Sequence, residues 1–501
     1  MDVSKIPDSL KENACVIKRF EEITLEIKAP GKYLLHQKHI YTILNENGDN
    51  EASYQASYDK FSSVDYLEGQ LYNADGKVLK KVKKKEMGDF AYQDGFSLVS
   101  DDRYISNDFA WRDYPYSVSY EEDDTRDGVL EFPAWVPQET PSMSVQYSKY
   151  VIIAPKGYQV RYKELNFSQS PVIKEGRDQV TYTWEMDNVP AKKGQDEGFV
   201  TDYRLPSMMV APSDFEEQGY SGNMDSWPNY GKFIYQLKEG KDSLPEDFKR
   251  QIHQMTDSLS NPLDKIRVLY QYLQQNTRYI SIQLGIGGWQ PFSANYVATK
   301  KYGDCKALSN FMVAMLKVAG LDGKYVEIRA GAHARPIEKD FPASQFDHVI
   351  CCVPLKKDTV WLECTTGDYP SGFLGSFTAN RWGVLIDKNG GTLVHTPNYD
   401  YHQNLEASHL RMTLDGQGNL SGTVHLFFRA EAAEDLLQYL NENSENDARD
   451  YIRKSIVLPT FDIQQLKFSK DMSELPSVSA DFQLTVSNYA QVSGKRIFIT
   501  P

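Results

Sequence analysis

The chain has 501 residues, of which 41% are hydrophobic, and a formal net charge of -14. It is too long for a single hydrophobic core, and the usual domain size of about 100 to 200 residues predicts about three domains. The acidic charge argues against a nucleic-acid-binding protein, because contact with phosphates requires a basic surface. No uninterrupted apolar run approaches the length of about 18 residues that a membrane-spanning helix requires.

Residues 1–215 are predicted to form an N-terminal β-rich domain. Apolar and polar residues alternate at 23–27 and again at 180–184, and this period of two is typical of strands with one buried face. Glycine-containing turn pairs separate such runs, so we expect many short strands in a sandwich or a strongly curved sheet. The basic run KVLKKVKKK at 77–85 follows an Asp-Gly turn and is interpreted as a solvated strand.

A central core is predicted to span residues 216–395. Asn261 is a candidate N-cap and proline follows it at the first helical position, so a helix is expected to begin there. Apolar residues recur at helical spacing over 308–319, and Gly320 follows where a left-handed C-terminal cap belongs. The glycine-rich stretch 280–305 between the two helices is expected to be a loop with a short strand at most.

Short β-rich runs follow the second helix, and residues 396–501 are predicted to form a C-terminal β-rich domain. Two strands are expected around an Asp-Gly turn at 415–416, followed by a helix near 431–443 and a further strand near 479–489. The run RIFITP at the end leaves open whether this domain is complete at Pro501.

The five cysteines include no CxxC pair and therefore give no support for a zinc ribbon, a redox pair or a disulfide framework. Two of them are adjacent on an expected strand and would point to opposite faces, which makes a poor metal or disulfide pair. No metal and no organic cofactor is predicted. The five are Cys15, Cys305, Cys351, Cys352 and Cys364.

Cys305 lies at the first turn of the second predicted helix, directly after Gly303 and Asp304. A thiolate at that place is stabilised by the unpaired N–H groups and the positive end of the helix dipole. A lone cysteine at a helix start is more often structural than catalytic, so its partners decide the interpretation. Asp304 is interpreted as a residue of the helix N-terminus rather than as a catalyst.

His348 and Glu363 are candidate partners of this cysteine. His348 begins an apolar strand, and the run VWLECT would form the neighbouring antiparallel strand, in which Val353 is expected to pair with Val360. In that register Glu363 faces Ile350 and is a diagonal neighbour of His348, within reach of a hydrogen bond. Glu363 would then orient the imidazole, as the third member of a catalytic triad does. The order of cysteine, histidine and acid along the chain matches a papain-like arrangement.

The motifs RYISIQLGIGGWQP, YGDCKALSNFMVAMLKVAG, FDHVI and WLECTTG resemble the transglutaminase-like cysteine-peptidase superfamily. More narrowly, the chain resembles a group common among gut Bacteroidetes, in which such a core lies between an N-terminal DUF3857-type domain and a C-terminal β-rich domain. The runs IYTILNENGDN, LYNADGKVLKK and SDDRYISNDF match the pattern of the N-terminal domain. The resemblance implies an α+β fold, with a papain-like, transglutaminase-like core flanked by β-rich, sandwich-like domains. It also implies that Cys305 is the nucleophile and His348 the base.

The third catalytic position of the family is usually aspartate, whereas this chain has Glu363. The longer side chain either orients His348 after a small backbone shift or signals weakened catalysis. The oxyanion of an acyl-transfer reaction needs a side-chain N–H beside the backbone N–H of the cysteine. The candidates for that side chain are Gln290, Trp289 and Gln283, and core packing or loop anchoring is the alternative role of each.

These features predict a cysteine protease or amidohydrolase that acts on a peptide or protein substrate through a thioester at Cys305. Hydrolysis is expected rather than cross-linking, because bacterial members of the superfamily are often peptidase-like. The alternatives are a catalytically weakened cell-envelope binding or scaffold protein and an amine acyltransferase. The resemblance also implies export to the periplasm or the cell surface, while the sequence gives no indication of the oligomeric state.

Overall fold

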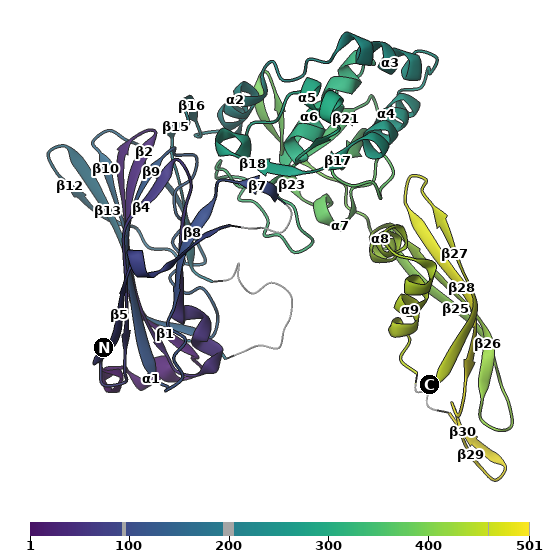
Figure 1. The fold of residues 1–501 in the computed structure, drawn as a ribbon, viewed down its shortest axis with the longest axis horizontal. Coiled ribbons are helices and arrows are strands. Elements are labelled where there is room, and N and C mark those ends of the chain that lie inside the picture. Colours follow the sequence, from purple (N-terminus) through teal and green to yellow (C-terminus); the bar gives the residue numbers. More distant parts are fainter. Residues whose placement is uncertain (93–96, 194–204, 459, 500–501) are drawn as a thin grey trace.

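A computed structural model of the chain describes residues 1–92, 97–193, 205–458 and 460–499. Two β-rich parts flank a central part in which helices pack on a five-stranded sheet (Figure 1). This is the α+β architecture that the sequence predicts, whereas the exact domain boundaries remain expectations. No helix among the described residues is long and apolar enough to cross a membrane.

The N-terminal part is built on an eight-stranded sheet with the order β12-β13-β10-β1-β2-β9-β4-β5. The neighbouring strands β1 and β10 are parallel, whereas the pairs on either side of them, β1–β2 and β10–β13, are antiparallel. The strands are β1 (Val16–Ala29), β2 (Lys32–Ile43), β4 (Ser62–Tyr72), β5 (Val78–Lys83), β9 (Tyr116–Asp127), β10 (Met143–Pro155), β12 (Val172–Glu175) and β13 (Gln179–Val189).

Smaller elements complete this part. A three-stranded sheet has the order β3-β8-β6, and β11 pairs with β14 and β15 with β16. Their bounds are α1 (Asp8–Lys11), β3 (Ser53–Tyr58), β6 (Gly88–Ala91), β7 (Ser97–Ser100), β8 (Arg103–Asp108), β11 (Arg161–Leu165), β14 (Ser207–Ala211), β15 (Asp214–Glu217) and β16 (Tyr220–Asn223), with 3-10 helices at Val3–Lys5, Glu46–Ala52 and Lys84–Glu86.

The prediction of short strands is wrong for the long strands of the large sheet, since β1 has 14 residues and β10 has 13. The alternation at 23–27 is present and its apolar side chains are buried, but it covers only the second half of β1. A β-bulge between Lys18 and Phe20 shifts the pairing with β2 and interrupts the alternation of buried side chains. A long bulged strand therefore looks like a short strand in the sequence.

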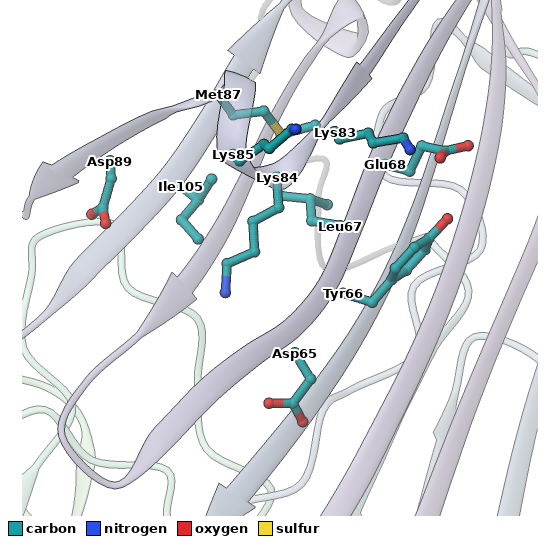
Figure 2. A pocket seen from close by; sticks show the side chains of 10 residues that line it. All are labelled: Asp65, Tyr66, Leu67, Glu68, Lys83, Lys84, Lys85, Met87, Asp89 and Ile105. Atoms are coloured by element: carbon teal, nitrogen blue, oxygen red, sulfur yellow. The ribbon is translucent and has the colours of Figure 1, made fainter.

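The basic run at 77–85 forms the edge strand β5 and the start of a 3-10 helix, with most of its side chains exposed. This confirms the solvated strand. Three of its lysines line an open groove together with the acidic side chains of Asp65, Glu68 and Asp89 (Figure 2). Because the charges are mixed, the groove offers no uniformly basic surface to a polyanion.

The central part contains an antiparallel sheet of order β22-β21-β20-β23-β24. The strands are β20 (Lys324–Ile328), β21 (His348–Pro354), β22 (Thr359–Leu362), β23 (Trp382–Asp387) and β24 (Gly390–His395). The helices are α2 (Trp227–Lys238), α3 (Glu246–Thr256), α4 (Pro262–Asn276), α5 (Ala294–Lys300), α6 (Cys305–Val318) and α7 (Gly375–Thr378), with a 3-10 helix at Gly285–Gly288.

Both predicted helices of the core are confirmed. In α4 the Asn261 side chain accepts a hydrogen bond from the Leu263 N–H at 3.1 Å, and this satisfies one of the unpaired donors of the first turn. After α6, Gly320 has a φ of 78°, the left-handed conformation that ends helices and favours glycine. The Leu308, Phe311 and Met315 stripe of α6 is buried in the core.

The expectation of a loop at 280–305 is wrong for α5. Ser293 caps this helix by accepting from the Tyr296 N–H, and Lys301 ends it with a φ of 64°. The seven-residue helix has too few turns to be stable alone. Its buried residues Ala294 and Val297 belong to the same hydrophobic cluster as α6, so tertiary packing holds it.

Three very short strands accompany α5. They are β17 (Arg278–Tyr279), β18 (Ser281–Gln283) and β19 (Tyr302–Gly303). β17 pairs with β19, whereas β18 pairs in parallel with β7 of the N-terminal part (Figure 1). The Ser97 hydroxyl donates to the Ser281 hydroxyl at 2.9 Å across this pair. The N-terminal part thus contributes a strand directly beside the segment that leads to Cys305.

The C-terminal part is an antiparallel sheet of order β25-β26-β28-β27 with two helices against it. Its elements are β25 (Leu405–Leu414), β26 (Leu420–Arg429), a 3-10 helix at Ala430–Ala433, α8 (Glu434–Glu442), α9 (Glu445–Ser455), β27 (Phe461–Asp471), β28 (Ser477–Val486), β29 (Gln491–Ser493) and β30 (Arg496–Phe498). The predicted hairpin, helix and later strand are confirmed as β25–β26, α8 and β28. Helix α9, which has only two buried side chains, was not predicted.

Candidate active site

Cys305 is the first residue of α6, and its side chain is only 6% exposed. Asp304 caps this helix, since its Oδ1 accepts a hydrogen bond from the Ala307 N–H at 2.9 Å. Asp304 therefore occupies the N-terminal position that the sequence predicts. The sulfur lies where the unpaired N–H groups and the helix dipole favour a negative charge.

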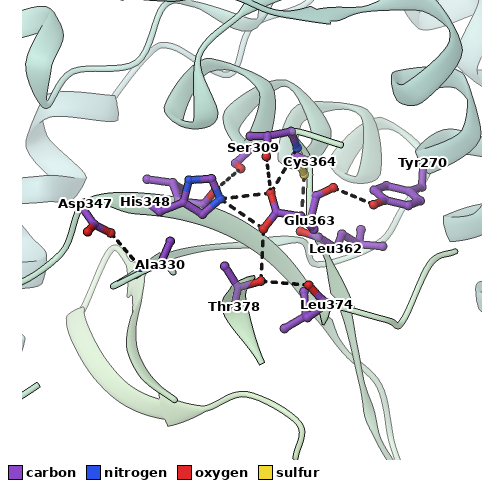
Figure 3. Close-up of polar contacts among 12 residues, drawn as sticks. Tyr270, Ser309, Ala330, Asp347, His348, Leu362, Glu363, Cys364, Leu374 and Thr378 are labelled. Atoms are coloured by element: carbon purple, nitrogen blue, oxygen red, sulfur yellow. Dashed lines mark hydrogen bonds and ion pairs between the residues drawn. The ribbon is translucent and has the colours of Figure 1, made fainter. Parts of the chain in front are cut away.

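The His348 imidazole is held by Glu363. Its Nε2 lies 3.0 Å from Glu363 Oε1 and 3.1 Å from Oε2 (Figure 3). Both side chains are buried, with His348 8% and Glu363 1% exposed. Since Nε2 is engaged by the carboxylate, Nδ1 is the nitrogen that remains for a second partner.

The hairpin that carries these residues has the predicted register, with Val353 paired with Val360. The ladder ends at the pair of Cys351 and Leu362, so the predicted pairing of Glu363 with Ile350 does not form. Glu363 lies one residue beyond the end of β22 and is free of the pleat. Glu363 therefore meets His348 from a position outside the ladder.

Three donors besides His348 hold the Glu363 carboxylate. Thr365 donates its N–H at 3.2 Å and its hydroxyl at 2.6 Å. The Thr378 hydroxyl donates at 3.2 Å (Figure 3). Burial acts to raise the pKa of Glu363, but the charge of His348 and these hydrogen bonds outweigh it and lower the pKa. The Tyr270 hydroxyl also donates to the Glu363 carbonyl at 2.6 Å. Glu363 is therefore held as a carboxylate in a fixed position.

The electrostatics favour a protonated imidazole. Burial acts to lower the pKa of His348, yet the charge of Glu363 and a side-chain hydrogen bond with Cys305 outweigh it and raise the pKa to about 10. His348 therefore interacts with both Glu363 and Cys305. A cationic imidazole between a carboxylate and a thiol is the arrangement that stabilises a thiolate.

Two family models match the chain. Residues 249–369 match the transglutaminase-like superfamily, and residues 29–193 match DUF3857, a domain of unknown function for which a structure is solved. The chain combines a DUF3857 domain with a transglutaminase-like core. Cys305, His348 and Glu363 all lie within the residues that match the transglutaminase-like superfamily.

One solved structure shares the fold of this chain. A structure described as a “putative protease” from Parabacteroides distasonis ATCC 8503 superposes with a TM-score of 0.57 at 11% identity, over 94% of this chain and 93% of that one. A structure described as a “putative cysteine protease” from Cytophaga hutchinsonii matches with a TM-score of 0.20 at 11% identity, over 68% of this chain and 78% of that one. No curated protein matches the sequence. The first similarity supports the fold of the whole chain.

The three oxyanion candidates lie in different surroundings. Gln283, in β18, has its amide Nε2 3.4 Å from Oδ2 of Asp304, the residue that precedes Cys305. The Gln290 amide instead donates to the Tyr220 hydroxyl at 3.2 Å. Trp289 lines a pocket formed mainly by residues of the DUF3857 domain and its neighbours. Of the three candidates, Gln283 is the one that contacts a residue adjacent to Cys305.

Several residues of the site had no clear signal in the sequence. Lys306 is buried, its Nζ lies 2.6 Å from Asp304 Oδ2, and it also contacts Gln283 Oε1 at 3.4 Å. Burial acts to lower the pKa of Lys306, but the charges of Asp304 and Cys305 raise it. In the sequence, the only sign that Lys306 belongs to the site is that it directly follows Cys305 in the GDCK motif.

Phe377 and Thr378 are two further residues that contact the His348–Glu363 pair. The Phe377 ring meets the His348 imidazole edge to face, with centroids 5.2 Å apart, and Thr378 contacts Glu363 as described above. Both belong to α7, which lies 12 or more residues beyond Glu363. No periodic pattern marks so short a helix, so the sequence could not reveal these contacts.

Proposed function

We propose that the protein is a cysteine-dependent hydrolase of peptide or amide bonds. Cys305 is the nucleophile, His348 carries the proton and Glu363 orients His348. The observation that carries the proposal is the buried His348 imidazole, which is bonded on Nε2 by Glu363 and interacts with the Cys305 side chain. The position of Cys305 at the start of α6 supports it further.

In the first half-reaction, the thiolate of Cys305 attacks the carbonyl carbon of the substrate. A C–S bond forms and the carbonyl electron pair moves to oxygen. When this tetrahedral species collapses, the C–N bond breaks and His348 gives its proton to the leaving amine. A thioester on Cys305 and a neutral imidazole remain.

In the second half-reaction, water attacks the thioester carbon while His348 takes a proton from it. The C–S bond then breaks, the acid product leaves, and the thiolate and imidazolium are restored. Gln283 is our choice as the side-chain donor to the oxyanion, beside the backbone N–H of Cys305, because its amide contacts Asp304. In the resting site this amide also donates to the Ser281 hydroxyl at 2.8 Å.

The pH dependence of alkylation tests the central claim. Iodoacetamide labelling of the full chain is followed by peptide mass spectrometry, which separates Cys305 from the other four cysteines. We expect labelling of Cys305 to persist well below the midpoint of an ordinary thiol, about 8.5. The proposal fails if Cys305 labels with that ordinary midpoint, and the scaffold alternative then gains support.

A product assay distinguishes hydrolysis from amine transfer. Casein peptides are incubated with the wild type, with Cys305→Ala and with Cys15→Ala as a matched control, since Cys15 lies in the N-terminal part. We expect new carboxyl termini with the wild type and Cys15→Ala only. Products that carry added methylamine in place of water would instead indicate an acyltransferase.

The location of the protein belongs to the same proposal. Its resemblance to an exported group supports action in the periplasm or at the cell surface, on a peptide or protein partner. Cell fractionation with an antibody against the chain tests this location, and a purely cytoplasmic signal would contradict it.

A further inference from the structure

Helix α8 of the C-terminal part contacts both segments that support Glu363. Glu434, its first residue, accepts hydrogen bonds from the Ser376 N–H at 2.7 Å and the Ser376 hydroxyl at 2.6 Å. Near its other end, the Asn441 amide donates to Asp368 Oδ1 at 2.6 Å. Ser376 belongs to α7, which lies beside α8 (Figure 1), and Asp368 belongs to the loop that follows Glu363. The C-terminal part therefore touches the surroundings of the site at two points.

Helix α7 connects the first of these points to the reacting groups. The residues on either side of the Ser376 contact are Gly375 and Phe377, and the ring of Phe377 packs on the His348 imidazole. One residue further, the Thr378 hydroxyl donates to Glu363 (Figure 3). A single helical turn does not hold its own conformation. Its position, and with it the position of both contacts, depends on what binds it from outside.

Several contacts from outside the helix hold α7. The Gly331 N–H donates to the Phe377 carbonyl and the Thr396 hydroxyl donates to the Thr378 carbonyl, both at 2.9 Å. On one side, the Arg381 guanidinium donates to the Ser376 carbonyl at 2.8 Å. On the other side is Glu434, whose close approach requires glycine at position 375. A Cβ on Gly375 would lie 2.5 Å from Glu434 Oε1, and its φ is 69°. Arg381 and Gly331 belong to the central part and Thr396 directly follows its last strand, so Glu434 is the anchor that helix α8 supplies.

We propose that Glu434 is a positioning residue for the His348–Glu363 pair, and that the C-terminal part acts through it as a clamp that sets the reactivity of Cys305. The inference rests on the proposed function of Cys305. Glu434 touches neither the thiol nor the imidazole in any contact recorded for the described residues, and it acts through Ser376, Phe377 and Thr378. Hydrogen bonds to a carboxylate are about twice as strong as neutral ones, so loss of this acceptor frees α7 more than loss of a neutral contact would.

Alkylation of Cys305 across pH 5 to 10 measures this effect in the full chain. With Glu434→Ala we expect the rate at about pH 6 to fall about tenfold, because misplacement of a reacting group by about 1 Å costs up to about 100-fold. The midpoint is expected to move toward the ordinary thiol value of about 8.5. Glu434→Gln keeps one carbonyl acceptor for Ser376, so it should restore most of the rate. Ser376→Ala removes the hydroxyl that donates to Glu434. This variant should therefore show part of the decrease in the alkylation rate of Cys305.

The matched control is Asp435→Ala, which removes one negative charge from the adjacent, exposed position of α8. Cys305 of this control should be alkylated at the wild-type rate. Thermal unfolding of each variant checks that the variant is folded. If Glu434→Ala and Ser376→Ala both label as the wild type, the clamp is refuted while the function of Cys305 stands. If the wild type itself labels as an ordinary thiol, the proposed function fails and the clamp fails with it.

Discussion

The two carboxylate oxygens of Glu363 lie 3.0 Å and 3.1 Å from the same imidazole nitrogen, Nε2 of His348. Glu363 lies just beyond the last pair of the β21–β22 ladder, so its side chain is not held in the sheet. Thr365 and Thr378 then fix this side chain. The geometry therefore favours the first of the two readings of Glu363, an orienting acid, and the consequences can be measured.

Two substitutions of Glu363 should distinguish the effect of its charge from the effect of its side-chain length. Glu363→Gln removes the charge that holds the imidazolium, so we expect cleavage of casein peptides to slow by about 100-fold or more, within the range of general acid–base catalysis. Glu363→Asp keeps the charge but shortens the side chain, and a loss of about tenfold is expected from the weaker contact. Thr366→Ser, which alters a neighbouring threonine that makes no recorded bond to Glu363, serves as the control. Equal activity of Glu363→Gln and wild type would contradict an orienting role.

The stability of the core should depend on pH through His348. Its pKa is about 10 in the folded chain and about 6.5 in the unfolded chain, so between these values the folded state binds the extra proton. The stabilisation is therefore complete below about pH 6.5 and is lost as the pH rises toward 10. We expect the wild type to lose on the order of 3 kcal/mol of unfolding free energy relative to His348→Gln over this window. Urea unfolding of both proteins at pH 6 and 9.5 measures the difference, and parallel pH profiles would refute it.

The buried pair of Lys306 and Asp304 should show strong coupling. Lys306→Met removes the cation 2.6 Å from the Asp304 carboxylate and leaves a buried charge without its ion-pair partner, which costs about 3 to 5 kcal/mol. Adding Asp304→Asn keeps a good N-cap and removes that charge. We expect the double variant to regain a large part of the lost unfolding free energy. A double-mutant cycle with no coupling would show that the two groups act independently.

The packing of α2 on β24 depends on Gly231. A Cβ at this position would lie 2.0 Å from the Gly391 nitrogen and 2.3 Å from its Cα, and backbone atoms cannot move aside as a side-chain end does. We expect Gly231→Ala to lower the unfolding free energy by about 2 to 3 kcal/mol. Gly416→Ala, where the added methyl group meets no atom within 4 Å, should change it by less than about 0.5 kcal/mol. Thermal or urea unfolding compares the two, and similar effects would contradict the packing argument.

The sequence predicts those parts of the core whose signals are local. The cap at Asn261, the apolar stripe of α6 and the left-handed Gly320 are each contained within a few residues, and all three are confirmed. The register of Val353 with Val360 is equally local, because a short connection fixes how the two strands meet. This register predicts that His348 and Glu363 lie close together, although Glu363 lies beyond the end of the ladder.

Features that depend on distant segments could not be predicted in this way. The parallel pairing of β1 with β10 joins strands more than 100 residues apart, and the bulge in β1 hides the true length of that strand. Helix α5 is held by packing against α6 rather than by its own sequence. The contact of Glu434 with Ser376 crosses from the C-terminal part to the core, and no spacing rule connects the two residues.

The parallel pairing of β18 with β7 means that the transglutaminase-like core is not closed by its own residues. Among the described strands, β18 has β7 as its partner, so a fragment that begins at residue 216 would carry a bare strand edge beside Gln283. Exposed edges of this kind recruit other strands and promote aggregation. We therefore expect a fragment without the DUF3857 domain to self-associate more readily than the full chain.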